Sequence, residues 1–189
     1  SMRLQSLGDE RWRFVTDSQA SVLLFSLRAT ETSEFIVQDG QLQPQLFERR
    51  RELPTKTSIT SQHFDWQRLS ETGRKDKKQW TIELQLGVHD RQSHMLAIQH
   101  DVAAGKKALT YTVSDGGKLR DYEYRIKAEE QIETPYGSYK TLRIERIRAD
   151  KDRQTITWLA PALDYLPVRV QQIEDGEEQA DMRLQALER

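Results

Sequence analysis

Three histidines lie close enough together in the chain to raise the question of a metal site. His89, His94 and His100 fall within twelve residues, with Asp90 and Asp101 beside them. Two ligands on one helix must be three or four residues apart to share a face. The spacings between these histidines are five and six residues. We therefore interpret them as surface or capping residues and expect neither a metal site nor a cofactor.

The patterns that nucleophilic or acid–base catalysis needs are also missing from the sequence. There is no cysteine, which excludes thiol nucleophiles, zinc–thiolate sites and disulfides. No Gly-x-Ser-x-Gly elbow occurs. Adjacent carboxylates such as Glu129 and Glu130 face opposite sides of a strand, and nothing around them predicts the apolar pocket that an acid–base pair needs. We expect no catalytic residues and no enzymatic activity.

The aromatic side chains are the remaining candidates for a binding site. The four tryptophans, Trp12, Trp66, Trp80 and Trp158, are spread along the chain. Tryptophan is costly to leave exposed, so core packing is the first interpretation. The second is that Trp66, Trp80 and Trp158, together with Tyr165, line a pocket for an apolar ligand. The sequence leaves both interpretations open.

The balance of charge argues against a nucleic-acid binder. The chain has 29 basic and 30 acidic residues, and its basic residues form only two short clusters, at 49–51 and 74–78. Strong attraction to phosphate backbones is therefore not indicated. No apolar run approaches the roughly 20 residues that a membrane helix needs. We expect a protein that does not span a membrane.

The elements that must position these side chains are mainly strands. Between Leu119 and Ala128 apolar and charged residues alternate, which is typical of an antiparallel strand with one wet face. Similar alternation occurs at residues 80–86, 109–113, 156–158 and 182–186. Hairpin turns are predicted between such runs, at Asp39-Gly40, Asp115-Gly116-Gly117, Pro135-Tyr136-Gly137, residues 149–152 and Asp175-Gly176. Short connections of this kind favour up-and-down neighbours.

Other segments depart from simple alternation. The apolar pattern changes phase between Ile144 and Ile147 and between Val170 and Ile173, which predicts a bulge at each step and a curved sheet. Residues 90–104 favour one helix, with Asp90 or Ser93 at its start and Gly105 at its end. Residues 22–27 are apolar on both faces and predict a central strand. Residues 70–78 are interpreted as a mobile loop.

These patterns predict an all-β fold with one short helix. We expect a curved antiparallel sheet, half-barrel or barrel-like, of roughly eight to ten strands with up-and-down connections. The 189 residues are enough for a core without disulfides or metal, and no boundary divides them. The sequence therefore predicts a single domain over residues 1–189.

Several motifs together resemble a known family. They are Phe64-Asp65-Trp66, residues 133–137 running into 141–146, Trp158-Leu159-Ala160-Pro161 and residues 164–169. Their order is similar to that in the bacterial envelope family called domain of unknown function 3108 (DUF3108), from Phe14 to the C-terminus. The resemblance implies an exported periplasmic protein of a Gram-negative bacterium, made with a signal peptide that this sequence lacks. The family has no established activity and supplies no residues of known function.

The motif residues also have an interpretation as structural elements. Pro161 and Pro167 cannot donate to a strand ladder and should frame a kinked crossing, with Tyr165 beneath the corner. Asp65 should accept a hydrogen bond from a backbone amide or from Arg169. For the whole chain we expect a periplasmic, non-catalytic binding module for an apolar or lipid-like ligand. The alternative is a structural or interaction protein of the cell envelope that binds a protein partner through a sheet edge or face.

Overall fold

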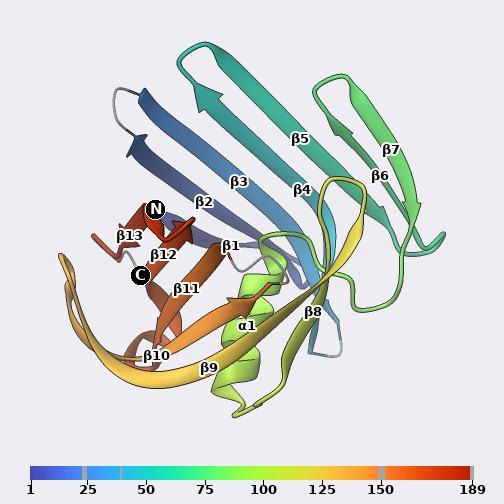
Figure 1. Ribbon diagram of the computed structural model, residues 1–189. Helices are drawn as coiled ribbons and strands as arrows, with labels where there is room; N and C mark the ends of the chain where they lie inside the picture. Colours follow the sequence, from blue (N-terminus) through green and yellow to red (C-terminus); the bar gives the residue numbers. More distant parts are fainter. Residues whose placement is uncertain (23–24, 39, 149–151, 188–189) are drawn as a thin grey trace. The chain divides into compact units, whose positions relative to one another are not determined.

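The structure, a computed structural model, describes residues 1–22, 25–38, 40–148 and 152–187 (Figure 1). These residues form thirteen strands, one α-helix and one short 3-10 turn. The strands are β1 (Met2–Gly8), β2 (Arg11–Val22), β3 (Phe25–Gln38), β4 (Gln41–Leu53), β5 (Lys56–Asp65), β6 (Ser70–Lys75), β7 (Lys78–Glu83), β8 (Leu109–Ser114), β9 (Leu119–Thr134), β10 (Gly137–Ile147), β11 (Arg153–Ala160), β12 (Leu166–Glu174) and β13 (Glu177–Arg183). Helix α1 spans Ser93–Ala103, and the 3-10 turn η1 spans Pro161–Leu163.

The strands belong to two open antiparallel sheets. One has the order β1-β2-β3-β4-β5-β6-β7 and the other the order β13-β12-β11-β10-β9-β8. Within each sheet, strands that follow one another in the chain pair with each other, as the short turns predicted. The all-β class with one short helix is confirmed, although the described strands outnumber the eight to ten expected. None of the helices in the described part of the chain has the length and apolar character required to cross a membrane.

The chain divides into two compact units. The first comprises residues 1–96 and 111–121, and the second comprises residues 97–110 and 122–189. The first unit contains the whole sheet β1–β7 and the start of α1. The second contains β10 to β13 and most of β9. Each unit has its own buried side chains, and the single domain expected from the sequence stays a prediction.

Two expectations for the first unit are wrong. Residues 70–78 are not a loop but the hairpin of β6 and β7. Its turn is held by Asp76, whose carboxylate accepts hydrogen bonds from the Ile59 amide (3.1 Å) and the Ser58 hydroxyl (3.0 Å). Residues 22–27 do not form one central strand, because β2 ends at Val22 and β3 begins at its pairing partner Phe25. Residues 23 and 24 lie outside the described residues, as do Asp39 and residues 149–151 of two predicted turns.

The predicted bulges are present in the second sheet, one of them displaced. The register shifts between Gln172 and Ile173, within the step that the sequence indicated, although the extra residue is Gln179 of the partner strand β13. In β10 the shift lies before Ile144, because the extra residue is Lys127 of the partner strand β9, and the ladder from Ile144 to Ile147 is regular. The strongly curved course of β9 is visible in Figure 1. The Asp175-Gly176 hairpin turn is confirmed, with φ of 54° and 77° as a type I′ turn requires.

The kinked crossing between β11 and β12 is confirmed. Pro161 opens η1, where a missing N–H costs nothing, and the chain then turns through Asp164 and Tyr165 at φ of 53° and 60°. The Tyr165 amide donates to the Ala160 carbonyl at 2.9 Å, which closes the corner. The register also shifts beside Pro167, where β11 and β12 meet.

Candidate functional site

One face of the sheet β1–β7, called here the inner face, carries two adjacent rows of side chains. Residues directly opposite each other in neighbouring strands point to the same face, so the register identifies both rows. The aromatic row consists of Leu4, Trp12, Phe14, Phe35, Phe47, Phe64 and Trp80. The charged row consists of Thr16, Glu31, Arg49 and Thr60. The inner face is therefore apolar along one side and polar along the other.

The segment that leads into α1 is anchored at the boundary between these rows. Asp90 is fully buried, and its Oδ2 accepts a hydrogen bond from the hydroxyl of Ser33 on β3 at 2.6 Å. Its Oδ1 accepts from the amides of Gln92 (2.6 Å) and Ser93 (2.9 Å). The Ser93 hydroxyl accepts from the Asp90 amide at 3.0 Å. This reciprocal arrangement is a capping box, and both residues expected at the helix start take part in it.

The environment of Asp90 changes its acidity. Burial is the largest influence and raises the pKa of its carboxyl from 3.8 to about 6. The hydrogen bonds from Ser33, Ser93 and Gln92 favour the charged form and oppose that shift. The His94 Nδ1 lies 3.3 Å from the Asp90 carbonyl oxygen. Because both carboxyl oxygens hold the helix start, these contacts assign Asp90 a structural role.

The charged row is neutralised within the first unit. Gln92 donates through its side-chain amide to Glu31. The other oxygen of Glu31 lies 3.7 Å from Arg49 Nη1 and 3.7 Å from Arg91 Nε. Arg91 also pairs with Asp115 at 3.2 Å. Burial, and then the charge of Arg91, lower the pKa of Arg49. Two arginines thus face two carboxylates, and the row carries no excess charge.

The indole of Trp80 takes part in a buried polar cluster. Its Nε1 donates to Oε1 of Glu71 at 2.7 Å, and the Gln62 side-chain amide donates to the same oxygen at 2.9 Å. Gln62 also donates to the Ser114 hydroxyl at 3.0 Å. Glu71, Gln62 and Ser114 are fully buried. The polar end of Trp80 is therefore fixed by hydrogen bonds inside the first unit.

Two glycines make room for the ring of Trp80. A Cβ on Gly73, its partner across β6 and β7, would lie 2.3 Å from the ring. A Cβ on Gly117 would lie 2.6 Å from it, and Gly117 also has φ of 80°. The ring is thus held against two stretches of bare backbone while part of it stays exposed.

Trp66 lies at the end of β5, where its ring stacks on Phe64 with centroids 6.2 Å apart. Its Nε1 donates to the Pro44 carbonyl at 2.6 Å, and the side chain is half-buried. The neighbouring Asp65 accepts from the backbone amides two and three residues later, at 3.1 and 3.0 Å. Of the two partners expected for Asp65, the backbone amide is confirmed.

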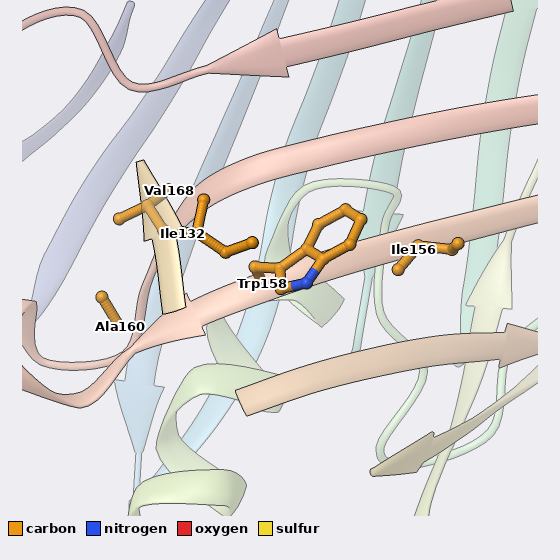
Figure 2. Close-up of a cluster of buried hydrophobic side chains, with 5 residues drawn as sticks. All are labelled: Ile132, Ile156, Trp158, Ala160 and Val168. Carbon is orange, nitrogen blue, oxygen red and sulfur yellow. The ribbon is translucent and has the colours of Figure 1, made fainter. Parts of the chain in front are cut away.

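Trp158 is the centre of the buried cluster in the second unit, which Figure 2 shows with Ile132, Ile156, Ala160 and Val168. Its Nε1 donates to Glu130 at 2.8 Å. The guanidinium of Arg169, directly opposite on β12, stacks 4.6 Å from the ring centre. Asp181 holds that guanidinium with two hydrogen bonds, at 2.7 and 3.1 Å.

The four residues predicted to bind a ligand thus fall into two pairs. Trp66 and Trp80 belong to the first unit, whereas Trp158 and the half-buried Tyr165 belong to the second. Each of the three tryptophans donates its indole N–H to a protein acceptor. Their role in ligand binding stays a prediction. Within the described ranges, no group of three or more His, Asp or Glu side chains is placed to hold a metal ion.

Sequence reasoning missed the buried polar residues of the inner face. Ser33 and Gln62 are two residues before Phe35 and Phe64 on the inner face of β3 and β5, and Glu71 lies opposite Phe64. A polar residue at an inward position of an alternating strand was the available signal. This signal could not be used without the strand register, because both faces of these strands carry polar residues and the sequence does not show which face is buried.

Comparison with known proteins gives a fold and a family. No curated protein matches the chain. Among solved structures, the crystal structure of a beta-barrel-like protein of domain of unknown function DUF1849 from Brucella abortus is similar, with a TM-score of 0.52 and 10% identity over 90% of this chain and 79% of that one. At this identity the likeness shows the fold alone. Residues 1–183 match the family described as "Protein of unknown function (DUF3108)", and the chain therefore belongs to that family.

Proposed function

We propose that this protein is a periplasmic, non-catalytic binding module whose ligand is apolar or lipid-like. The end of the aromatic row on β1 is the observation that supports this proposal. Leu4 is 51% exposed and Met2, on the same face, is 44% exposed, whereas Phe14, opposite Leu4 on β2, is buried. An apolar row that continues from the core into solvent offers a surface to an apolar molecule.

Titration with fatty acids and lysophospholipids, followed by tryptophan fluorescence, tests this proposal. Trp12, on β2, lies opposite Ser6 of β1 and would report binding near Leu4. Burial contributes about 0.8 kcal/mol per methylene, so a saturable change at micromolar ligand is expected. Leu4→Gln should weaken binding about tenfold, because it removes contact worth about two methylenes.

Arg3→Gln is the matched control for Leu4→Gln. Arg3 is exposed and points to the opposite face of β1, so its replacement should leave the affinity unchanged. Both variants should fold as the wild type does, since both positions are exposed. Equal affinity for the wild type and Leu4→Gln, or no saturable response at all, would contradict the proposal.

The outer edge of β1 favours a second candidate function, binding of a protein partner of the cell envelope by strand addition. Ser1 and Asp17 exchange both backbone hydrogen bonds, at 2.7 and 2.9 Å. Because such pairs alternate along an antiparallel ladder, the backbone groups of Met2, Leu4 and Ser6 point to the open edge. An edge of this kind is a template for another strand.

Ser6→Pro tests the second candidate. It removes one N–H from the open edge without breaking the β1–β2 ladder, and proline is tolerated in edge strands. A partner that is retained from envelope extracts by the wild type and by Ser6→Ala should be lost with Ser6→Pro. Retention of the same partner by Ser6→Pro would show that β1 is not the binding edge.

A further inference from the structure

Two arginines at the end of β10 lie side by side without a carboxylate. Arg146 belongs to β10 and Arg148 follows its last residue, so both side chains lie on one face of the sheet. Both are half-buried. Neither guanidinium forms an ion pair with an Asp or Glu of the described residues, and the nearest acid along β12, Glu174, pairs with Arg153 at 2.5 Å.

Five other half-buried arginines of the described chain have carboxylate partners, whereas Arg51 has none. These pairs are Arg13–Glu34 (2.6 Å), Arg49–Glu31 (3.7 Å), Arg91–Asp115 (3.2 Å), Arg143–Glu130 (3.2 Å) and Arg169–Asp181 (2.7 Å). A guanidinium that is partly removed from water normally needs such a partner. Arg51 lacks such a partner singly, whereas Arg146 and Arg148 lack it as two neighbouring arginines of one strand end.

Each guanidinium of the pair is held in place by one neighbour. Arg146 stacks on the ring of Tyr122, 3.1 Å from its centre. Arg148 donates from Nη2 to the Thr155 hydroxyl at 3.3 Å. The Nε atoms of both arginines are buried and have no hydrogen-bond partner among the described residues. Since a guanidinium carries five N–H donors, the pair keeps most of its donors unused.

The two positive charges also disfavour each other. Burial is the largest influence that lowers the pKa of Arg148, and the charge of Arg146 is the second. Arg153 adds a smaller effect of the same sign. An anion placed between the two guanidiniums would replace lost hydration and cancel the repulsion. The pair therefore offers an anion two positive guanidiniums, each held by one neighbour.

We propose that Arg146 and Arg148 together bind a phosphate group, either free or as the head group of a phosphate ester. A phosphate monoester carries a charge of about −1.5 to −2 near pH 7, which matches two guanidiniums. The forked guanidinium also suits two-point binding of phosphate oxygens. The site belongs to the second unit and is independent of the aromatic row of the first. A failure of this proposal would leave the function proposed above unaffected, and the reverse also holds.

Calorimetric titration with inorganic phosphate at low ionic strength tests the site. The wild type should bind one phosphate saturably, Arg146→Gln and Arg148→Gln should each weaken binding at least tenfold, and the double variant should abolish it. Arg125→Gln is the matched control, since it removes one charge from an exposed position on the opposite face of β9. It should leave the affinity unchanged. Thermal unfolding of each variant checks that the fold is retained.

The remaining arms identify the source of the phosphate and the basis of recognition. Binding to phosphatidylcholine vesicles only when they contain phosphatidic acid would assign a lipid head group, and phosphate binding without vesicle binding would assign a free phosphate. The Arg146→Lys, Arg148→Lys double variant keeps both charges but loses the forked N–H donors of the guanidiniums, so it should bind phosphate at least tenfold more weakly. Equal binding of acetate, an undiminished affinity of the lysine variant, or no phosphate binding by the wild type would overturn the proposal.

Discussion

Replacing Asp90 with alanine is expected to lower the free energy of unfolding by about 3 kcal/mol near pH 5. The loss has two sources. A helix cap contributes about 1–2 kcal/mol, and the buried hydroxyl of Ser33, now 2.6 Å from the carboxyl, would be left without its acceptor at a cost of about 1–3 kcal/mol. Urea unfolding followed by circular dichroism measures the change. A loss below about 1 kcal/mol would contradict the anchoring role assigned to Asp90.

The ionisation of Asp90 should be visible in the pH dependence of stability. Because burial raises its pKa from 3.8 to about 6, the folded state binds the proton more tightly than the unfolded state. Its contribution is therefore complete below the unfolded pKa and is lost as the pH rises from about 4 to about 6. At about 1.4 kcal/mol per pKa unit, the loss amounts to about 3 kcal/mol.

Asp90→Asn is the reference for that measurement. It keeps the shape of the cap without the titration, so the stability of the wild type relative to this variant should fall across the interval. The comparison also separates Asp90 from His94, whose ring nitrogen lies 3.3 Å from the Asp90 carbonyl oxygen and which both proteins contain. Parallel pH profiles of the two proteins would show that Asp90 does not titrate in this range.

Features that depend on neighbours in the sequence were predictable. The helix was found because Asp90 and Ser93 form its cap within three residues and Gly105, at φ of 75°, follows its end. The hairpin at Asp175-Gly176 was found because only a few residue pairs accept positive φ at both positions. In these cases the local chemistry and the final fold agree, so no tertiary information was needed.

Features that depend on the register between distant strands were not predictable. The β6–β7 hairpin was mistaken for a loop because Glu71 occupies a core-facing position, which only its contacts with Gln62 and Trp80 explain. At both predicted bulges the extra residue, Lys127 on β9 or Gln179 on β13, belongs to the partner strand, which the apolar pattern of β10 or β12 does not show. The Arg146–Arg148 pair could not be distinguished from solvated charge, since a missing partner is a property of the fold.

The largest effect is expected at Trp158. Trp158→Ala should lower the free energy of unfolding by about 3–5 kcal/mol, the usual cost of removing a buried aromatic side chain. Trp158 is 4% exposed and packs with Ile132 and Ile156 in the cluster of Figure 2. Its removal also takes the stacking surface from Arg169 and the N–H donor from Glu130. Chemical denaturation, followed by circular dichroism because the variant lacks one of the four tryptophan fluorophores, measures the change.

Trp158→Phe separates the ring from its N–H group. The smaller ring keeps most of the packing, so the loss should be about 1–2 kcal/mol. The hydrogen bond from Trp158 is the largest influence that lowers the pKa of Glu130, so in this variant that pKa should move back toward its ordinary value. An acid with a lowered pKa stabilises the fold above its unfolded pKa, and this contribution is lost as the pH falls through the folded value. The variant should therefore lose less stability than the wild type on acidification. Carboxyl chemical shifts measured across the titration would show the change, and an unaltered Glu130 titration would mean that the indole N–H does not hold this carboxylate in solution.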